Sequence, residues 1–260
     1  MNRIFILALI VALCAAQVFS QQLVFGNPSN ATSEVSNENN YFVTHDGFIL
    51  SYNRERGQPN WVAWHLSRQD TVKIADRDKS RFAPDMKLPA PWRIRPTDYK
   101  FAQYGYQRGH LCPSADRLNT QEANQETFQM SNMSPMLPSL NEDTWGESEM
   151  SVRRILKRNN YEAYIYAGCY GDKGRIDDKI TIPERCYKIV LYLPDGANDF
   201  SRVSTNTRVI AFDMPNSKTI DPDWRKYLTT VDAIEEKTGY DFLSTLPENI
   251  QAAIESKKDD

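Results

Sequence analysis

The sequence predicts a single α+β domain. Runs of β-branched and aromatic residues typical of strands recur between residues 41 and 213, and helical patterns lie among and after them without regular alternation. That mixture favours α+β over a parallel, doubly wound sheet. The chain has 260 residues, of which 40% are hydrophobic and 25% charged, so it can form one large globular domain. We expect the domain to span residues 41–260.

The first twenty residues have the pattern of a cleavable signal peptide. A positive start at Arg3 precedes an apolar run over residues 4–16. An uncleaved anchor is the alternative, but this run is shorter than the ~20 residues a spanning helix needs. A lipoprotein modified at Cys14 is disfavoured by the bulky Leu13 before it. We therefore expect a secreted or periplasmic protein.

The segment that follows, residues 21–40, is rich in Ser, Asn and Gln and shows no periodicity that would build a core. This composition predicts a flexible leader between the signal peptide and the domain. No later segment is apolar enough to span a bilayer, so we expect no membrane contact in the mature form.

The remaining elements are assigned in chain order. Strands are expected at residues 41–44, 48–52, 61–66, 161–168, 179–182, 187–193 and 208–213, and helices at residues 140–158, 231–237 and 248–256. Thr230 suits the start of the second helix, Gly239 its end, and Pro247 the start of the third. The long stretch 76–100 lacks a clear period. Loops of that length in compact domains are usually functional.

Three cysteines remain after removal of the signal peptide. Cys169 and Cys186 lie in two strands that could be neighbours, and an oxidising compartment favours a disulfide between them. This pairing leaves Cys112 free. Three buried free thiols are the alternative.

The formal net charge of −3 excludes a protein that coats nucleic acid by bulk electrostatics. It does not exclude an enzyme that binds a few phosphates locally.

One polar turn between strand-like pieces, residues 106–117, is the first candidate site. A histidine such as His110 has a reference pKa of about 6.5, which suits a base that accepts a proton from water at neutral pH. Arg108 adds a permanent charge whose planar fork fits a phosphate. By itself, an Arg-Gly-His sequence is more often a structural turn.

The helix expected at residues 140–158 carries the second candidate. Asn141, Trp145, Glu149 and Arg153 follow one another at i to i+4 steps and so form one stripe. An amide, a carboxylate and a guanidinium therefore share one side of the helix. A surface salt bridge of Glu149 with Arg153, beside a capping asparagine, is the structural alternative.

Together these residues resemble the DNA/RNA non-specific endonucleases, the ββα-metal family of nucleases. Its hallmarks are Asp-Arg-Gly-His, Asn-x-x-Pro, Leu-Asn-x-x-x-Trp and a Glu four residues after that Trp. Here the motifs fall, in this order, at residues 107–110, 132–135, 140–145 and 149. The resemblance covers roughly residues 60–257.

The resemblance implies a mainly antiparallel central sheet flanked by helices, with the site where a β-hairpin meets the Asn141 helix. His110 is then the general base, and Asn141 the direct ligand of one Mg²⁺, which Mn²⁺ could replace. Sparse ligation by oxygen suits Mg²⁺, which keeps several waters. Glu149 would hold metal-bound water, while Arg108 and Arg153 would bind phosphate. The residues expected to support the site are Gln107, Gly109 and Asn132.

Two positions depart from the family pattern. Gln107 stands where the family has Asp, and a neutral amide still forms hydrogen bonds but supplies no charge. In the string at residues 82–85, Ala83 stands where the family has a phosphate-binding Arg. We expect Arg81 to substitute for it, with Arg77 as the alternative.

The other polar residues are expected to be structural. His65 lies in an apolar strand and should be a satisfied structural histidine, while His45 fits a hairpin turn. The acidic loop around Asp172, Asp177 and Asp178 should be solvated, because no calcium-loop pattern is complete.

The sequence thus predicts an exported, Mg²⁺-dependent endonuclease that cuts DNA and RNA with little sequence preference, because its expected contacts are to phosphate and metal. The first alternative is a catalytically weakened member of the family that binds nucleic acid. The second is a phosphodiesterase for a smaller substrate.

Overall fold

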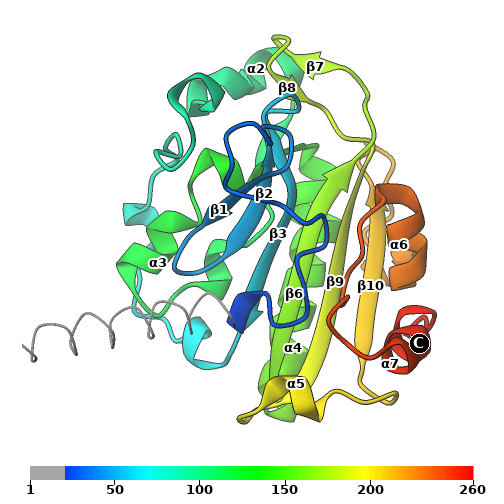
Figure 1. The fold of residues 1–260 in the computed structure, drawn as a ribbon. Helices are drawn as coiled ribbons and strands as arrows, with labels where there is room; N and C mark the ends of the chain where they lie inside the picture. The colour runs from blue at the N-terminus through cyan, green and yellow to red at the C-terminus, as the bar shows by residue number, and fades with distance from the viewer. Residues whose placement is uncertain (1–20, 260) are drawn as a thin grey trace, which may run out of the picture.

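A seven-stranded antiparallel sheet forms the centre of the protein (Figure 1), in the order β1-β2-β3-β6-β9-β10-β11. The computed structural model describes residues 21–259, apart from the side chain of Asp78, so the expected signal peptide lies outside the described residues. The strands are β1 (Tyr41–Thr44), β2 (Ile49–Asn53), β3 (Gln58–Leu66), β6 (Tyr161–Tyr170), β9 (Arg185–Pro194), β10 (Val209–Pro215) and β11 (Leu228–Thr229).

Two small hairpins and several helices surround this sheet. The hairpins are β4 (Gln107–His110) with β5 (Met133–Met136), and β7 (Arg175–Ile176) with β8 (Ile180–Thr181). The α-helices are α2 (Phe101–Tyr104), α3 (Gln121–Glu126), α4 (Gly146–Asn159), α5 (Asp199–Arg202), α6 (Val231–Thr238) and α7 (Glu248–Glu255). Short 3₁₀ helices are η1 (Gln69–Thr71), η2 (Arg77–Lys79), η3 (Ala90–Trp92), η4 (Pro96–Tyr99), η5 (Ser114–Asp116), η6 (Met130–Asn132) and η8 (Trp224–Tyr227), while η7 (Ser139–Trp145) is π-helical. None of the helices in residues 21–259 has the length and apolar character needed to cross a membrane.

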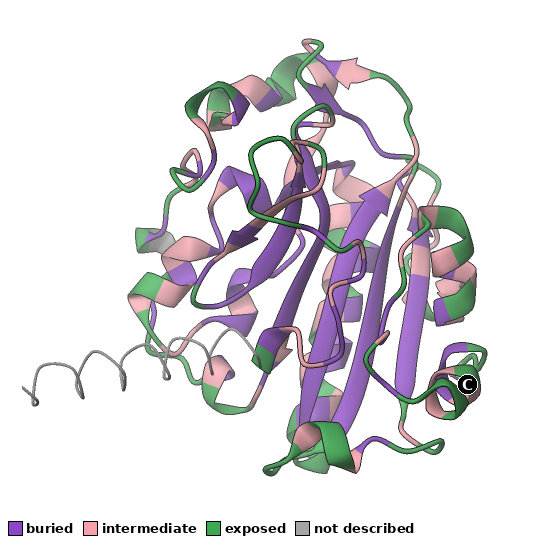
Figure 2. Cartoon of the chain, viewed as in Figure 1, coloured by how far each residue is buried: buried purple, intermediate pink, exposed green. Residues whose placement is uncertain are grey.

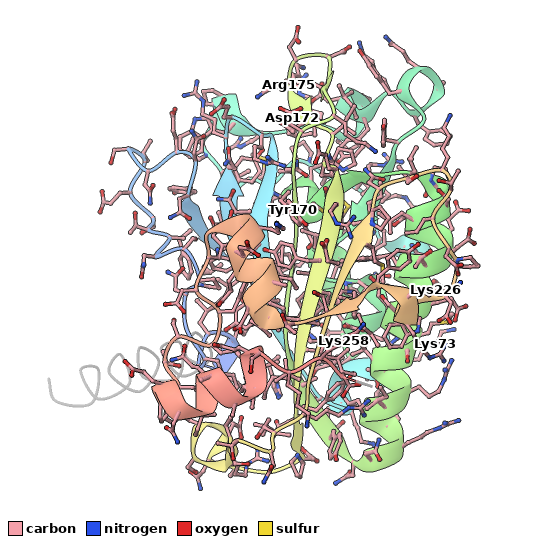
Figure 3. The ribbon with its side chains drawn as sticks, turned by 90° about the vertical axis from the view of Figure 1, so that its right-hand side faces the viewer. Lys73, Tyr170, Asp172, Arg175, Lys226 and Lys258 are labelled. Atoms are coloured by element: carbon pink, nitrogen blue, oxygen red, sulfur yellow. A yellow bond between two sulfur atoms is a disulfide. The ribbon has the colours of Figure 1, made fainter. Side chains whose placement is uncertain are left out.

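Both faces of the sheet are buried, because side chains alternate between two cores along each strand. In β3, Val62 and Trp64 belong to the core beneath α4, whereas Trp61 and Ala63 belong to the core beneath α6 and α7. The central strands are accordingly buried along almost their whole length (Figure 2). Seen from the side, α4 lies on one side of the sheet and α6 with α7 on the other (Figure 3). This architecture confirms the α+β prediction.

The predicted flexible leader, residues 21–40, is wrong. Phe25 is fully buried and lies edge-on to Tyr164, with ring centroids 4.7 Å apart. The Trp61 indole donates a hydrogen bond to Ser29 Oγ over 2.7 Å. A single aromatic anchor and side-chain hydrogen bonds thus fix a polar segment that has no periodicity of its own.

Several local predictions are confirmed. Cys169 and Cys186 form a disulfide between directly opposed positions of β6 and β9, and Cys112 is buried and free. Thr230 Oγ1 caps α6 by accepting from Ala233 N at 3.1 Å, and Gly239 ends the helix with φ +71°. The predicted helix at 140–158 is instead a π-helical turn, η7, continued by α4.

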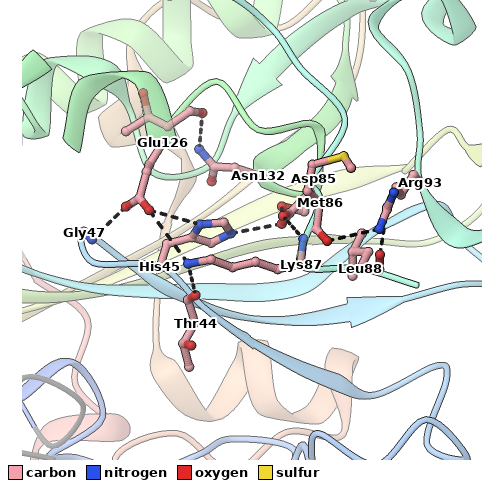
Figure 4. Close-up of polar contacts among 12 residues, drawn as sticks. Thr44, His45, Gly47, Asp85, Met86, Lys87, Leu88, Arg93, Glu126 and Asn132 are labelled. Carbon is pink, nitrogen blue, oxygen red and sulfur yellow. Dashed lines mark hydrogen bonds and ion pairs between the residues drawn. The ribbon is translucent and has the colours of Figure 1, made fainter. Parts of the chain in front are cut away.

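A buried polar cluster around His45 fixes the β1–β2 turn (Figure 4). His45 Nε2 lies 2.9 Å from Asp85 Oδ2, its Nδ1 lies 3.6 Å from Glu126 Oε1, and Glu126 also accepts from the backbone of residue 46. Burial lowers the pKa of His45, but the two carboxylates outweigh it, so the net pKa is raised. The pKa values of Asp85 and Glu126 are lowered, because their bonds with His45 outweigh burial.

This cluster predicts that the stability lost in His45→Gln depends on pH. The raised pKa of His45 means that its stabilisation is complete below pH 6.5 and declines as the pH rises through the folded-state pKa. The two carboxylates have the opposite pH dependence. Their stabilisation is lost as the pH falls below their ordinary pKa values. We expect His45→Gln to lower the free energy of unfolding by ~3 kcal/mol at pH 6 and by clearly less at pH 9. Urea denaturation at both pH values measures this loss. An equal loss at pH 6 and pH 9 would contradict the prediction.

Candidate active site

The β4–β5 hairpin carries the residues from Gln107 to His110 and holds Gln107 beside Asn141 of η7. His110 pairs with Met133 and Gly109 with Ser134. A Cβ atom at Gly109 would collide with the side chain of Met136, so glycine is required for this close packing. The hairpin therefore fixes the backbone on either side of His110.

Asn132 secures the loop that follows His110. Its Oδ1 accepts from Cys112 N at 3.0 Å, and its Nδ2 donates to the carbonyl oxygens of Cys112 and Thr127, each at 2.8 Å. The side chain is fully buried. Buried amides with all partners in place rigidify a structure, so Asn132 acts through the backbone next to His110.

His110 lies in an aromatic pocket formed by Phe82 and Phe128, with ring centroids 5.6 and 4.9 Å away. Its Nε2 is buried and has no hydrogen-bond partner among the described residues. Burial, and then the positive charges of Arg77 and Arg108, lower the pKa of His110 to about 3. The imidazole is therefore neutral near pH 7 and able to accept a proton.

Asn141 is held in one orientation by Gln107. Asn141 Nδ2 donates to Gln107 Oε1 over 2.7 Å, and Gln107 Nε2 in turn donates to Glu142 Oε1. Within residues 21–259, Asn141 Oδ1 has no such partner and remains free to act as a ligand. The amide at position 107 thus provides the acceptor that an aspartate would provide, without the negative charge.

Glu149 belongs to a buried network of four charged side chains. It lies 3.4 Å from Lys188 Nζ, which is also 4.2 Å from the centre of the Trp145 ring. Arg153 pairs with Asp116 at 2.8 Å. Burial raises the pKa of Glu149 and lowers that of Lys188, so each group depends on the other to stay charged.

These elements enclose a cleft of about 960 Å³. His110, Asn141 and Glu149 all line it, and so does Glu142. Its basic residues are Arg77, Lys100 and Arg108. The Arg108 guanidinium lies 4.1 Å from the centre of the Phe82 ring, which holds the charge at the wall. The cleft therefore combines a neutral base, oxygen ligands and three cations.

Two arginines expected to bind phosphate do not line this cleft. Arg153 forms an ion pair with Asp116, and its side chain is only 15% exposed. Arg81 donates to the carbonyl of Ser80 outside the cleft wall. Arg77 lines the cleft instead, from η2 in the irregular stretch before the hairpin. No sequence period specifies which arginine of this stretch faces the cleft, so sequence reasoning ranked Arg81 first.

The donor set fits a hard divalent cation. The free Asn141 Oδ1 and the carboxylates of Glu142 and Glu149 supply only oxygen, and all three residues line the same cleft. Mg²⁺ prefers oxygen ligands, needs few from the protein and retains waters, for which the cleft has room. His110 also carries ring nitrogens, but its ring packs against the aromatic side chain of Phe128.

Comparisons with known proteins identify nucleases among the relatives of this chain. The chain is 42% identical over 241 residues to a nuclease of Nostoc sp., covering 92% of this chain and 86% of that protein. It is 28% identical to the mitochondrial endonuclease G of Caenorhabditis elegans, covering 83% of this chain and 72% of that protein.

Among solved structures, a chain of the EndoG/EndoGI complex has the same fold, with a TM-score of 0.73 and 24% identity over 88% of this chain and 93% of that one. The family model for DNA/RNA non-specific endonucleases matches residues 26–249. The chain therefore belongs to the DNA/RNA non-specific endonuclease family.

Proposed function

We propose that this nuclease is an exported, metal-dependent endonuclease that hydrolyses phosphodiester bonds of DNA and RNA with little sequence preference. The observation that carries the proposal is that His110, whose Nε2 has no hydrogen-bond partner among the described residues, lines the same basic cleft as an oriented Asn141. A base and an oxygen ligand that line the same cleft suit hydrolysis of an ester of phosphate.

His110 acts as the general base in this proposal. Its neutral imidazole takes a proton from the attacking water. The backbone carbonyl of His110 accepts a hydrogen bond from Trp145 Nε1 at 3.2 Å, which ties the base to the helical segment that carries Asn141. Base and ligand are therefore positioned by one rigid unit.

Asn141 is the proposed direct ligand for Mg²⁺, with Mn²⁺ as a substitute. When bound, the ion would neutralise charge on the phosphate and favour departure of the leaving oxygen. Gln107 holds the Asn141 amide in the orientation that exposes Oδ1, and Glu149, fixed by Lys188, would accept hydrogen bonds from nearby water.

Arg108 and Arg77 are the proposed phosphate contacts. Both charges line the cleft. Arg77 takes the place first expected for Arg81, and Arg153, which pairs with Asp116, stays a further proposed phosphate contact. Contacts of this kind bind the backbone and carry no information about the base, so both DNA and RNA suit the cleft.

Export remains part of the proposal. The pattern of residues 1–20 and the disulfide between Cys169 and Cys186 support it, because disulfides persist in oxidising compartments. Recovery of protein from the medium or periplasm with an N-terminus near residue 21 is the expected result. Full-length protein retained in the cytoplasm would contradict it.

Digestion of plasmid DNA and total RNA tests the activity. We expect cutting of both substrates with Mg²⁺ or Mn²⁺, none with EDTA, and a strong loss in Asn141→Ala because the metal ligand is removed. Glu147→Gln, on the solvent side of α4, serves as the matched control and should cut normally. Binding without cutting, across several metals, would favour the catalytically weakened family member. Cutting of small phosphodiesters alone would favour a phosphodiesterase for a smaller substrate.

A further inference from the structure

Three carboxylates converge between α6 and α7, on the opposite side of the sheet from α4. Asp232 and Glu235 lie three residues apart on α6, and Glu255 is the last residue of α7. Their oxygens come within 4.8 Å of one another. Figure 1 shows the two helices one above the other along the β10 edge, and Figure 3 shows α4 beyond the sheet. The cluster is therefore separate from the active site.

Glu255 is the buried member of this cluster. The residue is only 6% exposed, and its Oε1 has no hydrogen-bond partner among the described residues. The charges that act on it come from Asp232, Glu235 and Asp241, all acidic. Burial, and then these like charges, raise the pKa of Glu255 to about 8. A buried carboxylate without a cation or donor is costly, so Glu255 takes up either a proton or a bound cation.

The other two members leave an entrance for that group. Glu235 has one oxygen engaged, because its Oε1 accepts from Phe242 N at 2.6 Å, and it keeps the other for a ligand. Asp232 is exposed, so the cluster opens to solvent on its side. In residues 21–259, no lysine or arginine forms an ion pair with any of the three carboxylates. A diffusible cation can therefore reach the cluster.

Calcium is the cation that this chemistry favours. Ca²⁺ takes six to eight oxygen ligands in flexible geometry, which three carboxylates from two helices plus water can supply. Mg²⁺ demands near-ideal octahedral geometry and holds its water tightly. We propose that Asp232, Glu235 and Glu255 bind a structural Ca²⁺ ion that joins α6 to α7, independently of the catalytic metal.

Thermal unfolding of the full chain with increasing CaCl₂, at constant ionic strength, tests the site. Asn141→Ala serves as the background, so that binding at the proposed catalytic position does not contribute. We expect Ca²⁺ at ~100-fold its Kd to raise Tm by ~5 °C or more. MgCl₂ at the same concentration should give a much smaller rise. Isothermal titration with CaCl₂ should show one site per chain.

Two further variants make the result specific. In Glu255→Gln the calcium-dependent rise in Tm should disappear, whereas Glu236→Gln, an exposed acid on the same helix, should keep it. Without divalent ions, Glu255→Gln should melt above its background, because a repelled carboxylate is removed. Saturating Ca²⁺ should reverse that order. No calcium-dependent rise in the background, or a rise retained in Glu255→Gln, would overturn the proposal and leave Glu255 as a protonated carboxyl.

Discussion

Replacing His110 with alanine should reduce kcat for plasmid cleavage by roughly 10²–10⁴-fold, the usual contribution of a general base. Nucleic-acid binding should change little, because Arg77 and Arg108 remain in the cleft. The fold should also persist, since the buried Nε2 of His110 has no hydrogen-bond partner to lose. Single-turnover cleavage with saturating Mg²⁺ measures the loss.

The control for this experiment is His65→Ala. His65 pairs with Glu162 at 2.8 Å and does not line the cleft, as expected for a structural histidine. Its replacement should lower stability while leaving the rate per folded molecule near that of the wild type. An His110→Ala enzyme that cuts within tenfold of the wild-type rate would show that another group accepts the proton.

The second large effect is expected at Lys188. Its side chain is 2% exposed and neutralises Glu149, so Lys188→Met leaves a carboxylate buried without its cation. We expect a loss of ~3 kcal/mol in the free energy of unfolding, because breaking a buried ion pair costs more than removing both charges. Urea denaturation near pH 7 measures it.

The double variant Lys188→Met with Glu149→Gln distinguishes the charge effect from loss of packing. Because no unpaired charge remains, it should recover much of the stability that the single variant loses. Activity should stay low in the double variant, since Glu149 is missing from the cleft. A single variant as stable as the wild type would mean that Glu149 is protonated and needs no partner.

The sequence was sufficient for most of the fold and for the centre of the site. Strand patterns in residues 41–66 and 161–193 predicted the main sheet, and spacing alone placed Asn141 on the same segment as Glu149. Local signals carried these predictions: alternation along strands, capping at Thr230, and glycine at position 239. Such signals act within a few residues of one another.

The parts that were missed depend on contacts between distant residues. Arg153 pairs with Asp116, 37 positions away in the sequence, and Lys188 of β9 is buried against Trp145 of η7. The pocket of Phe25 is built by residues more than a hundred positions away. Neither propensity nor periodicity encodes such partners, so the prediction of a flexible leader was wrong and the ion pair of Arg153 with Asp116 was not foreseen.

The packing of the N-terminal segment has a consequence for biosynthesis. Val24 O accepts from Thr245 Oγ1 at 2.8 Å, and Pro28 O accepts from Asp241 N at 2.9 Å. These two contacts of the N-terminal segment can therefore form only after nearly the whole domain has been synthesised. A nascent chain cannot complete this core during elongation. Completion of this core is therefore expected only after residues 241–245 have left the ribosome.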